Sequence, residues 1–135
     1  YLLVLIRLYE LQDQVIVLGR LSAEEMKTQF LRSSVFVCPS VMENSPNTIG
    51  EAMLLGVPVV ASRTGGIPSM VEDGVTGLLF HNGDAEDLAD SIDRIWSDQT
   101  LVKELSAHER IRASYIHDGS KNYERLLEIY REILE

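Results

Sequence analysis

Four short apolar runs alternate with helical segments along this chain, and this alternation limits its fold more than any other feature of the sequence. The runs cover residues 14–18, 35–38, 57–61 and 78–80, and each is continuous rather than alternating between apolar and polar residues. Such runs are typical of strands that are covered on both faces of a parallel sheet. With helices between them, they predict an α/β fold: a doubly wound, Rossmann-like, mostly parallel sheet with helices on both faces.

Start and stop signals place helices between these runs. Ser22, with Glu25 three residues later, forms a capping box, and Asp84 is a second N-cap. Gly56 and then Pro58 form a stop signal for the helix before them. The segments SRTGGIPSM and EDGVTG predict a glycine-bearing loop and a turn. The expected helices cover residues 2–11, 21–34, 46–55, 85–97, about 100–115 and 121–134.

Two of the expected helices carry apolar side chains on one face, at helical spacing. In the helix over 85–97 these residues are Leu88, Ile92, Ile95 and Trp96. In the last helix they are Tyr123, Leu126, Leu127, Tyr130 and Leu134, and we expect this stripe to pack in the core.

Length and charge exclude several classes of protein. A chain of 135 residues argues for one domain at most, and no apolar run reaches the roughly 18 residues that span a membrane. The formal net charge of −9 disfavours nucleic acid and acidic membrane surfaces as partners, because both require a basic footprint. A phosphate ligand remains compatible with this charge, since a helix N-terminus binds anions through its backbone N–H groups.

Residue types that bind metals or cofactors are sparse. The histidines at 81, 108 and 117 are scattered, no two of them lie at metal-ligand spacing, and we expect no metal site. The segment TGGIPS does not match the glycine pattern of a dinucleotide site, and we expect no cofactor. The single cysteine, Cys38, can form no internal disulfide; we expect a small buried hydrophobe and a cytoplasmic protein.

The segment ENSPNTIGE (43–51) places two carboxylates where a ligand would bind. Ligands of open parallel sheets bind beyond the carboxyl ends of the strands, and Glu43 follows the run 35–38 on that rim. Ser45 and Pro46 indicate the N-cap and first residue of a helix, which leaves N–H groups near 47–48 free for a phosphate. Glu51 would then face the crevice and accept two hydrogen bonds from a diol.

The spacing of these residues also allows structural roles. Thr48 and Glu51 form a capping box if the helix begins later, and Glu43 is then a solvated loop residue. Arg63 lies close to the same rim and could contact a phosphate, although a solvated loop arginine is the commoner case.

Residues 35–80, VFVCPSVMENSPNTIGEAMLLGVPVVASRTGGIPSMVEDGVTGLLF, resemble the C-terminal half of retaining GT-B glycosyltransferases of family 4. Several parts match in order: PS after a strand, Glu43-x7-Glu51, EAM followed by GVPVVA, then GGIP, then EDGVTGLL. Upstream, LQDQVIVLGRLSAEEM matches the preceding strand and loop, and downstream GDAEDLADSI matches the following helix. The resemblance covers nearly the whole chain, and the ordered set is specific where each motif alone is weak.

The resemblance implies a role for each matching residue. Glu43 matches the glutamate that contacts the donor sugar near the reacting centre, and Glu51 matches the one that binds the ribose hydroxyls. The donor sugar and diphosphate would meet Asn44, Ser45, Pro46, Asn47 and Thr48, and the base would meet Gly19, Arg20 and Leu21. The implied reaction is transfer of a sugar from a UDP-, GDP- or ADP-linked donor to an unknown acceptor, with retention at the anomeric carbon and no obligatory metal.

The chain also departs from the family pattern. Many relatives carry glycines and an aromatic where this chain has Asn44, Ser45 and Pro46, which leaves the donor sugar open. The N-terminal acceptor domain, the first two strands and a basic pair for the diphosphate are absent from this sequence. We therefore expect a fragment: residues 1–117 as part of the nucleotide-sugar-binding domain, and 118–135 as a C-terminal helix that packs back toward the absent domain. Part of the apolar face of this helix could then be left uncovered in this chain. Such a fragment should not catalyse transfer alone, and any peripheral membrane association would require the absent domain.

Two alternatives remain open at this point. The chain could be a non-catalytic nucleotide-binding or assembly module of the same fold, or part of a GT-B epimerase that acts on the nucleotide sugar. The absent strands would also leave open edges on the strands over 15–18 and 35–38. Such edges invite pairing, and we expect a contact between two copies, such as a homodimer, rather than pairing of these two strands with each other.

Overall fold

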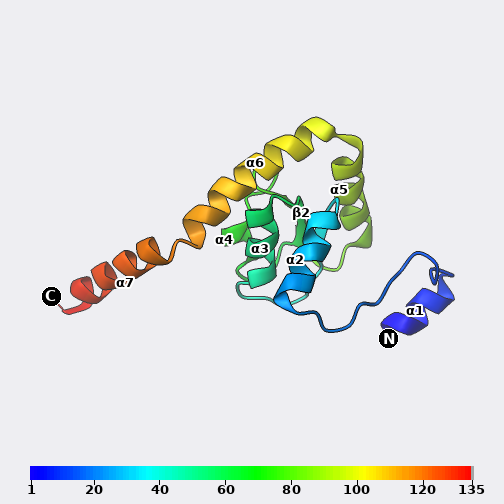
Figure 1. Ribbon diagram of the computed structural model, residues 1–135, viewed down its shortest axis with the longest axis horizontal. Helices are drawn as coiled ribbons and strands as arrows, with labels where there is room; N and C mark the ends of the chain where they lie inside the picture. The colour runs from blue at the N-terminus through cyan, green and yellow to red at the C-terminus, as the bar shows by residue number, and fades with distance from the viewer. Residues whose placement is uncertain (135) are drawn as a thin grey trace.

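The computed structural model describes residues 1–134, and it has a three-stranded parallel sheet at its centre (Figure 1). The strands are β1 (Phe36–Cys38), β2 (Val59–Ser62) and β3 (Leu78–Phe80), in the order β1-β2-β3. Phe36 pairs with Val59, and Val60 pairs with Leu78. The predicted Rossmann-like α/β class and the parallel direction of these three strands are confirmed.

Helices cover both faces of this sheet, and the helices of the chain lie close to their predicted positions. They are α1 (Leu2–Leu8), α2 (Ala23–Arg32), α3 (Asn47–Leu55), α4 (Ile67–Met70), α5 (Ala85–Ser97), α6 (Gln99–Ile116) and α7 (Gly119–Leu134). The capping box of Ser22 and Glu25 is present at α2, and the side chain of Asp84 caps α5. Gly56 ends α3 in the left-handed conformation, with φ of 70°. The short helix α4 lies within the segment predicted as a loop.

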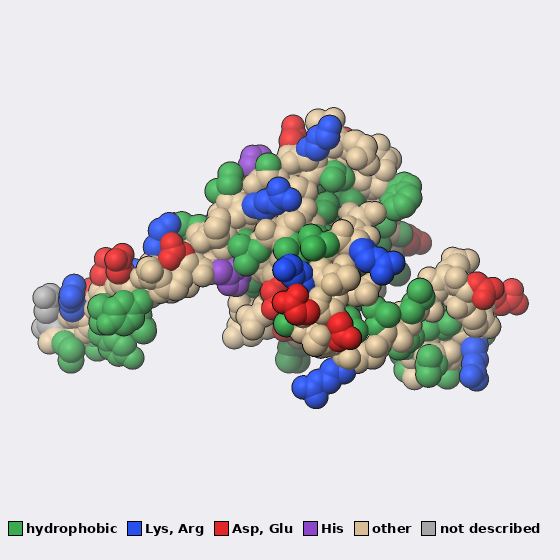
Figure 2. All heavy atoms as spheres, in the orientation of Figure 1, with side chains coloured by type: hydrophobic (Ala, Val, Ile, Leu, Met, Phe, Trp, Pro, Cys, Tyr) green, Lys and Arg blue, Asp and Glu red, His purple; other side chains and the backbone are tan. Residues whose placement is uncertain are grey.

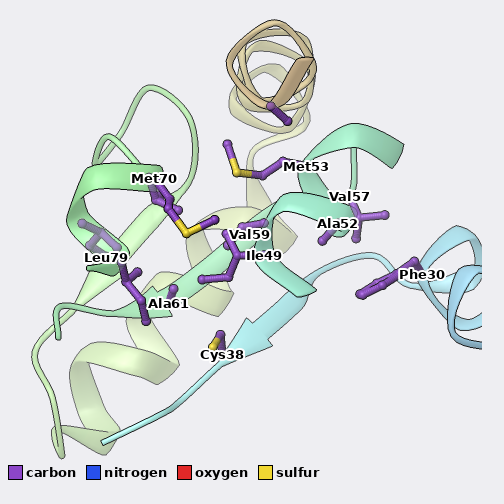
Figure 3. Packing of buried hydrophobic residues seen from close by; sticks show 13 residues of the cluster. Phe30, Cys38, Ile49, Ala52, Met53, Val57, Val59, Ala61, Met70 and Leu79 are labelled. Carbon is purple, nitrogen blue, oxygen red and sulfur yellow. The ribbon is translucent and has the colours of Figure 1, made fainter. Parts of the chain in front are cut away.

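Side chains of the strands alternate between two apolar clusters, one on each face of the sheet. On one face Val59, Ala61 and Cys38 pack with residues of α3 and α4 (Figure 3). On the other face Val60 and Phe80 pack with residues of α5 and α6. Both faces are therefore covered, which explains the continuous apolar runs in the sequence. Cys38 is buried, as predicted.

The helix α6 connects the two clusters. Leu105 belongs to the cluster beneath α5, and Ala113, two turns later, belongs to the cluster beneath α3. Between them Glu109 is completely buried, and its Oε1 accepts a hydrogen bond of 2.9 Å from the N–H of Val59 at the start of β2. This contact ties α6 to the amino-terminal edge of the sheet.

The strand predicted over 15–18 is not present, and this prediction was wrong. These residues form an extended connection from α1 to α2 without a strand partner among residues 1–134 (Figure 1). Ile16 is 82% exposed. A β-branched run becomes a strand only where a neighbouring strand satisfies its backbone groups and covers its side chains. Pairing of residues 15–18 with β1 in the same chain would have ruled out the expected contact between copies. These residues do not pair with β1, so that contact stays a prediction.

The apolar stripe of the last helix is not part of the core, so the prediction of core packing was wrong. The helix α7 extends away from the body of the molecule, with its hydrophobic side chains gathered along one side (Figures 1 and 2). No residue of α7 is buried, and Tyr123 is 63% exposed. An amphipathic pattern specifies an apolar face but not the surface that covers it. The proposed division at residue 117 stays a prediction.

The helix α5 follows its predicted face only in part. Ile95 is buried in the core, whereas Trp96 is exposed at the end of the helix. Among residues 1–134, no helix combines the length and the apolar content required to cross a membrane.

Candidate functional site

The three parallel strands end at the same edge of the sheet, and the loops that follow them meet there. These loops comprise residues 39–46 after β1, 63–66 after β2 and 81–84 after β3. Ligands of open α/β sheets bind at this edge. The predicted residue Glu43 lies in the first loop, and the helix α3 begins at the end of that loop.

Hydrogen bonds from the other two loops hold the first loop in place. The hydroxyl of Ser62, at the end of β2, donates to the carbonyl of Ser40 at 2.6 Å. The side chains of Thr64 and Asn82 both donate to the carbonyl of Val41, each at 3.0 Å. Polar side chains at the ends of β2 and β3 therefore fix the path of the chain that carries Glu43.

The loop after β3 is itself anchored to α5. The backbone N–H of His81 donates to Asp87 Oδ2 at 2.7 Å, and the His81 ring nitrogen Nδ1 lies 2.6 Å from the same oxygen. The N–H and the ring of His81 hold the pKa of the Asp87 carboxyl below its usual value. This anchor sets the position from which Asn82 reaches Val41.

Two consecutive glycines allow the second loop to lie directly against the first. The N–H of Gly66 donates to the carbonyl of Glu43 at 3.3 Å. A Cβ atom at Gly65 would collide with the Glu43 carbonyl, and one at Gly66 would collide with the Asn44 carbonyl. Gly65 also has a φ of +51°, which side-chain-bearing residues rarely adopt. The predicted glycine-bearing loop thus forms one wall of the candidate site.

The carboxylate of Glu43 is partly buried and has a local hydrogen-bond donor. The hydroxyl of Ser40 donates to Glu43 Oε1 at 3.3 Å, and Cys38 Sγ lies 3.6 Å from the same hydroxyl. Glu43 is therefore not a freely solvated loop residue. The hydroxyl of Ser45 instead donates to Met70 Sδ at 3.5 Å, which ties the end of the loop to α4.

The N-terminus of α3 opens onto this rim one residue later than predicted. Pro46 is the N-cap and Asn47 is the first helical residue, so the assignment of Ser45 and Pro46 to N-cap and first residue was wrong by one position. No side chain caps the helix, and the alternative capping box of Thr48 and Glu51 does not form. Within residues 1–134, no backbone hydrogen bond involves the N–H of Asn47 or Thr48. These donors are available to an anion.

Glu51, in the second turn of α3, is exposed and lies in a crevice between α2 and α3. The crevice has a volume of about 320 Å³ and is also lined by Glu24, Lys27, Phe30 and Leu54. The crevice combines the charged side chains of Glu24, Lys27 and Glu51 with apolar side chains from both helices. Such a surface suits a ligand with a flat apolar part and a diol.

The remaining predicted residues, Gly19, Arg20 and Leu21, immediately precede α2. Gly19 adopts a φ of +71° and Ser22 caps the helix, so this segment leads directly into the first turn that lines the Glu51 crevice. Arg20 is exposed. No hydrogen bond among residues 1–134 joins residues 19–21 to Glu43 or Glu51.

Arg63 has a structural partner. Its guanidinium donates to Asp73 Oδ2 at 2.8 Å, and Asp73 Oδ1 accepts from the N–H of Leu79. Arg63 is thus a partly exposed arginine that is paired with a carboxylate. It stabilises the turn before β3.

Sequence reasoning did not assign a role to Ser62, Thr64 or Asn82. The signal that could have found them is position: each is a polar residue at or just beyond the end of an expected strand, on the edge that carries Glu43. Ser62 is completely buried, which is unusual for a serine at a strand end and marks its structural role.

These features define a Rossmann-like α/β domain. Its candidate site lies at the carboxyl edge of the sheet and comprises a glutamate-bearing loop and the N-terminus of α3, which no side chain caps. The chain belongs to the glycosyl transferases group 1 family, whose family model matches residues 1–114. The resemblance to GT-B glycosyltransferases is thereby confirmed at the level of the family and the fold.

Relatives and solved structures agree with this assignment. The chain is 39% identical over 108 residues to the alpha-maltose-1-phosphate synthase of Mycolicibacterium smegmatis, covering 75% of this chain and 28% of that protein. It superposes on the sucrose-phosphate synthase of Thermosynechococcus elongatus with a TM-score of 0.88 and 30% identity, covering 98% and 33%. It superposes on Anabaena HepE, solved in complex with UDP-glucose, with a TM-score of 0.87 and 26% identity, covering 97% and 36%. The chain thus spans about a third of the length of these proteins.

Proposed function

We propose that this chain is the donor-binding part of a glycosyltransferase that takes a sugar from a nucleoside-diphosphate sugar and transfers it with retention of configuration at the anomeric carbon. The observation that carries the proposal is the rim itself: Glu43 on a loop fixed from two other loops, beside the uncapped start of α3. The relative HepE, solved with UDP and with UDP-glucose, supports a nucleotide sugar as the ligand class.

Glu51 would hold the ribose. A carboxylate can accept from both hydroxyls of a ribose diol, and Glu51 is exposed on the wall of a crevice. The crevice volume of about 320 Å³ lies at the lower end of the range for small-molecule sites. The base would lie toward residues 19–21, which lead into α2. The apolar side chains of Phe30 and Leu54 would cover the flat part of the nucleoside.

The diphosphate would bind at the start of α3. The N–H groups of Asn47 and Thr48 are free donors, and the helix dipole places partial positive charge there. Pro46 contributes no N–H, so the side chains of Asn47 and Thr48 would supply the remaining hydrogen bonds. This arrangement suits the leaving diphosphate without a metal ion.

Glu43 would act at the sugar. Positive charge develops at the anomeric carbon when the bond to the diphosphate breaks, and a fixed carboxylate nearby stabilises that charge. The Ser40 hydroxyl donates to Glu43 Oε1 and leaves the second oxygen for the sugar. The bonds to Ser40 and Val41 from the neighbouring strands hold this carboxylate in place while charge develops.

Titration of the chain with UDP, followed by backbone amide shifts, tests the proposal. We expect saturable shifts confined to residues 19–21 and 43–51. Replacing Glu51 with alanine should weaken UDP binding about tenfold, because a hydrogen bond to a charged group is worth about 1.5–3 kcal/mol. The matched control is Glu24→Gln, which removes a charge from the same crevice without removing the ribose contact. Equal losses in both variants, or shifts confined to other surfaces, would contradict the assignment.

A longer protein that contains this chain should separate the roles of the two glutamates. Glu43→Gln should lower kcat about 100-fold or more with little change in KM for the donor, because its interaction strengthens in the transition state. Glu51→Ala should mainly raise KM for the donor. Steady-state kinetics with the natural donor and acceptor provide the measurement, with Glu72→Gln, an exposed glutamate in the turn before β3, as control. The reverse pattern would overturn this division of roles.

A further inference from the structure

A second pocket lies at the opposite edge of the sheet from Glu43. It has a volume of about 490 Å³, within the range of small-molecule sites. Its lining includes Ser34, just before β1, and Pro58, just before β2, so it opens at the amino ends of the strands. Strands of three to four residues place this edge at least about 10 Å from the rim that carries Glu43. The pocket is therefore separate from the Glu43 rim, and it shares no lining residue with the Glu51 crevice.

The lining of this pocket carries no ionisable side chain. Its residues are Ser33, Ser34, Gly56, Pro58, Ile95, Trp96, Gln99, Val102 and Ser106. In a chain whose residues are 24% charged, this distinguishes the pocket from the Glu51 crevice, which is lined by Glu24, Lys27 and Glu51. The guanidinium of Arg110 lies beside Gly56 at the margin of the pocket, but it donates to the carbonyl of Leu55. The lining itself therefore offers no cation to a phosphate or carboxylate and favours a neutral ligand.

Three of the four serine and glutamine side chains in the lining are available to a ligand, whereas the fourth, Ser33, donates to the carbonyl of Gln29. Within residues 1–134, no hydrogen bond engages the side chains of Ser34, Gln99 or Ser106. Together they offer two hydroxyls and an amide, which both donate and accept. A wholly apolar ligand would cover these groups without replacing their bonds to water, at a cost of about 1–3 kcal/mol each.

The aromatic wall of the pocket is Trp96. It lies at the end of α5 with 72% of its surface exposed, next to Ile95, which is 2% exposed and also lines the pocket. An exposed tryptophan offers a flat apolar face with one N–H donor at its edge. A pyranose ring has the complementary form: an apolar face of C–H groups and a rim of hydroxyls.

We propose that this pocket is a second binding site for a neutral saccharide, with one pyranose ring stacked on Trp96 and its hydroxyls bonded to Ser34, Gln99 and Ser106. The site lies outside the donor rim and takes no part in bond breaking. A glycan bound in this pocket would stay attached to the protein while another part of the same glycan reacts at a different site. The proposal stands on the pocket alone and goes beyond the donor-binding function.

Tryptophan fluorescence tests this site directly, because Trp96 is the only tryptophan in the sequence. Titration of the chain with maltose, cellobiose and sucrose should give a saturable change in emission in the millimolar range with at least one of them. UDP should leave the emission unchanged while shifting the amides of residues 43–51. The two sites therefore succeed or fail independently.

Two variants assign the signal to the pocket. Ser106→Leu fills the cavity and Gln99→Ala removes the amide; each should weaken the saccharide response about tenfold with the circular dichroism spectrum unchanged. The control is Ser114→Leu, on α6 but outside the pocket lining, which should keep the response. No saturable response to any of the three saccharides, or a response that survives Ser106→Leu, would overturn the proposal. The proposal would also be overturned if, in a longer protein, the Trp96 emission without saccharide differed from that of this chain and did not respond to saccharides. Another part of that protein would then occupy the pocket.

Discussion

We expect the stability of the parent chain to decrease as pH rises from about 4.5 to 7, and we expect the substitution Glu109→Gln to remove this decrease. Glu109 is completely buried between α6 and β2, and only its Oε1 has a partner, the N–H of Val59. Its Oε2 has no hydrogen-bond partner among residues 1–134. Burial raises the pKa of the Glu109 carboxyl to about 7, although the Val59 N–H and the charge of Arg110 act in the opposite direction.

The direction of the pH effect follows from the proton balance. In the unfolded chain this carboxyl has its ordinary pKa near 4.5, so between pH 4.5 and 7 the folded state binds more protons than the unfolded state. Stability therefore falls as pH rises through this window, and below it the group contributes no pH dependence. Each tenfold difference in proton affinity is worth about 1.4 kcal/mol, so the full transition corresponds to about 3 kcal/mol.

Urea denaturation at a series of pH values measures this effect. The Glu109→Gln variant keeps an acceptor for Val59 and cannot ionise, so its stability should be nearly flat where that of the parent falls. Glu104→Gln, an exposed position on the same helix, is the matched control and should retain the parent slope. If Glu109→Gln shows the same pH dependence as the parent, the buried carboxyl is already ionised or hydrated in the folded state.

Local signals in the sequence predicted local structure well. The capping box at Ser22, the cap at Asp84 and the left-handed Gly56 depend only on neighbouring residues, and each is present. The three strands that form are covered on both faces, so each consists of a continuous apolar run. This run is the pattern from which they were predicted. The fourth run, 15–18, has the same composition, but a strand also requires a neighbour that composition does not supply.

Contacts between distant segments were beyond sequence reasoning. The spacing of Glu43 and Glu51 predicted that both lie near a ligand rim. It could not show that Ser62 and Thr64, more than 20 residues away, hold the chain just before Glu43. The same limit applies to Trp96, whose helical spacing matched the core face although it lies at the exposed end of α5. Amphipathic spacing defines a direction around a helix, whereas burial depends on what lies in that direction.

Substituting alanine at Gly65 or Gly66 is expected to lower the free energy of unfolding by about 2–4 kcal/mol, the upper range for single substitutions. At both positions the new Cβ would meet a backbone carbonyl rather than a side chain that can turn aside: that of Glu43 for Gly65, and that of Asn44 for Gly66. The loop that carries Glu43 must then move, and saturable UDP shifts at residues 43–51 should be lost in both variants.

Gly74 separates this collision from backbone strain. It has a φ of +74° but no atom within 4 Å of a new Cβ, so Gly74→Ala should cost only the left-handed backbone, about 1–2 kcal/mol, and leave UDP binding intact. Gly66 has an ordinary φ of −85°, so Gly66→Ala tests the collision alone, whereas Gly65→Ala combines both effects and should be the most destabilised of the three. Urea denaturation and UDP titration of all three variants provide the comparison. If Gly66→Ala is as mild as Gly74→Ala and still binds UDP, the loop of Glu43 can move without loss of the site. In that case the close contact between this loop and Gly65 and Gly66 does not fix the position of the Glu43 carboxylate.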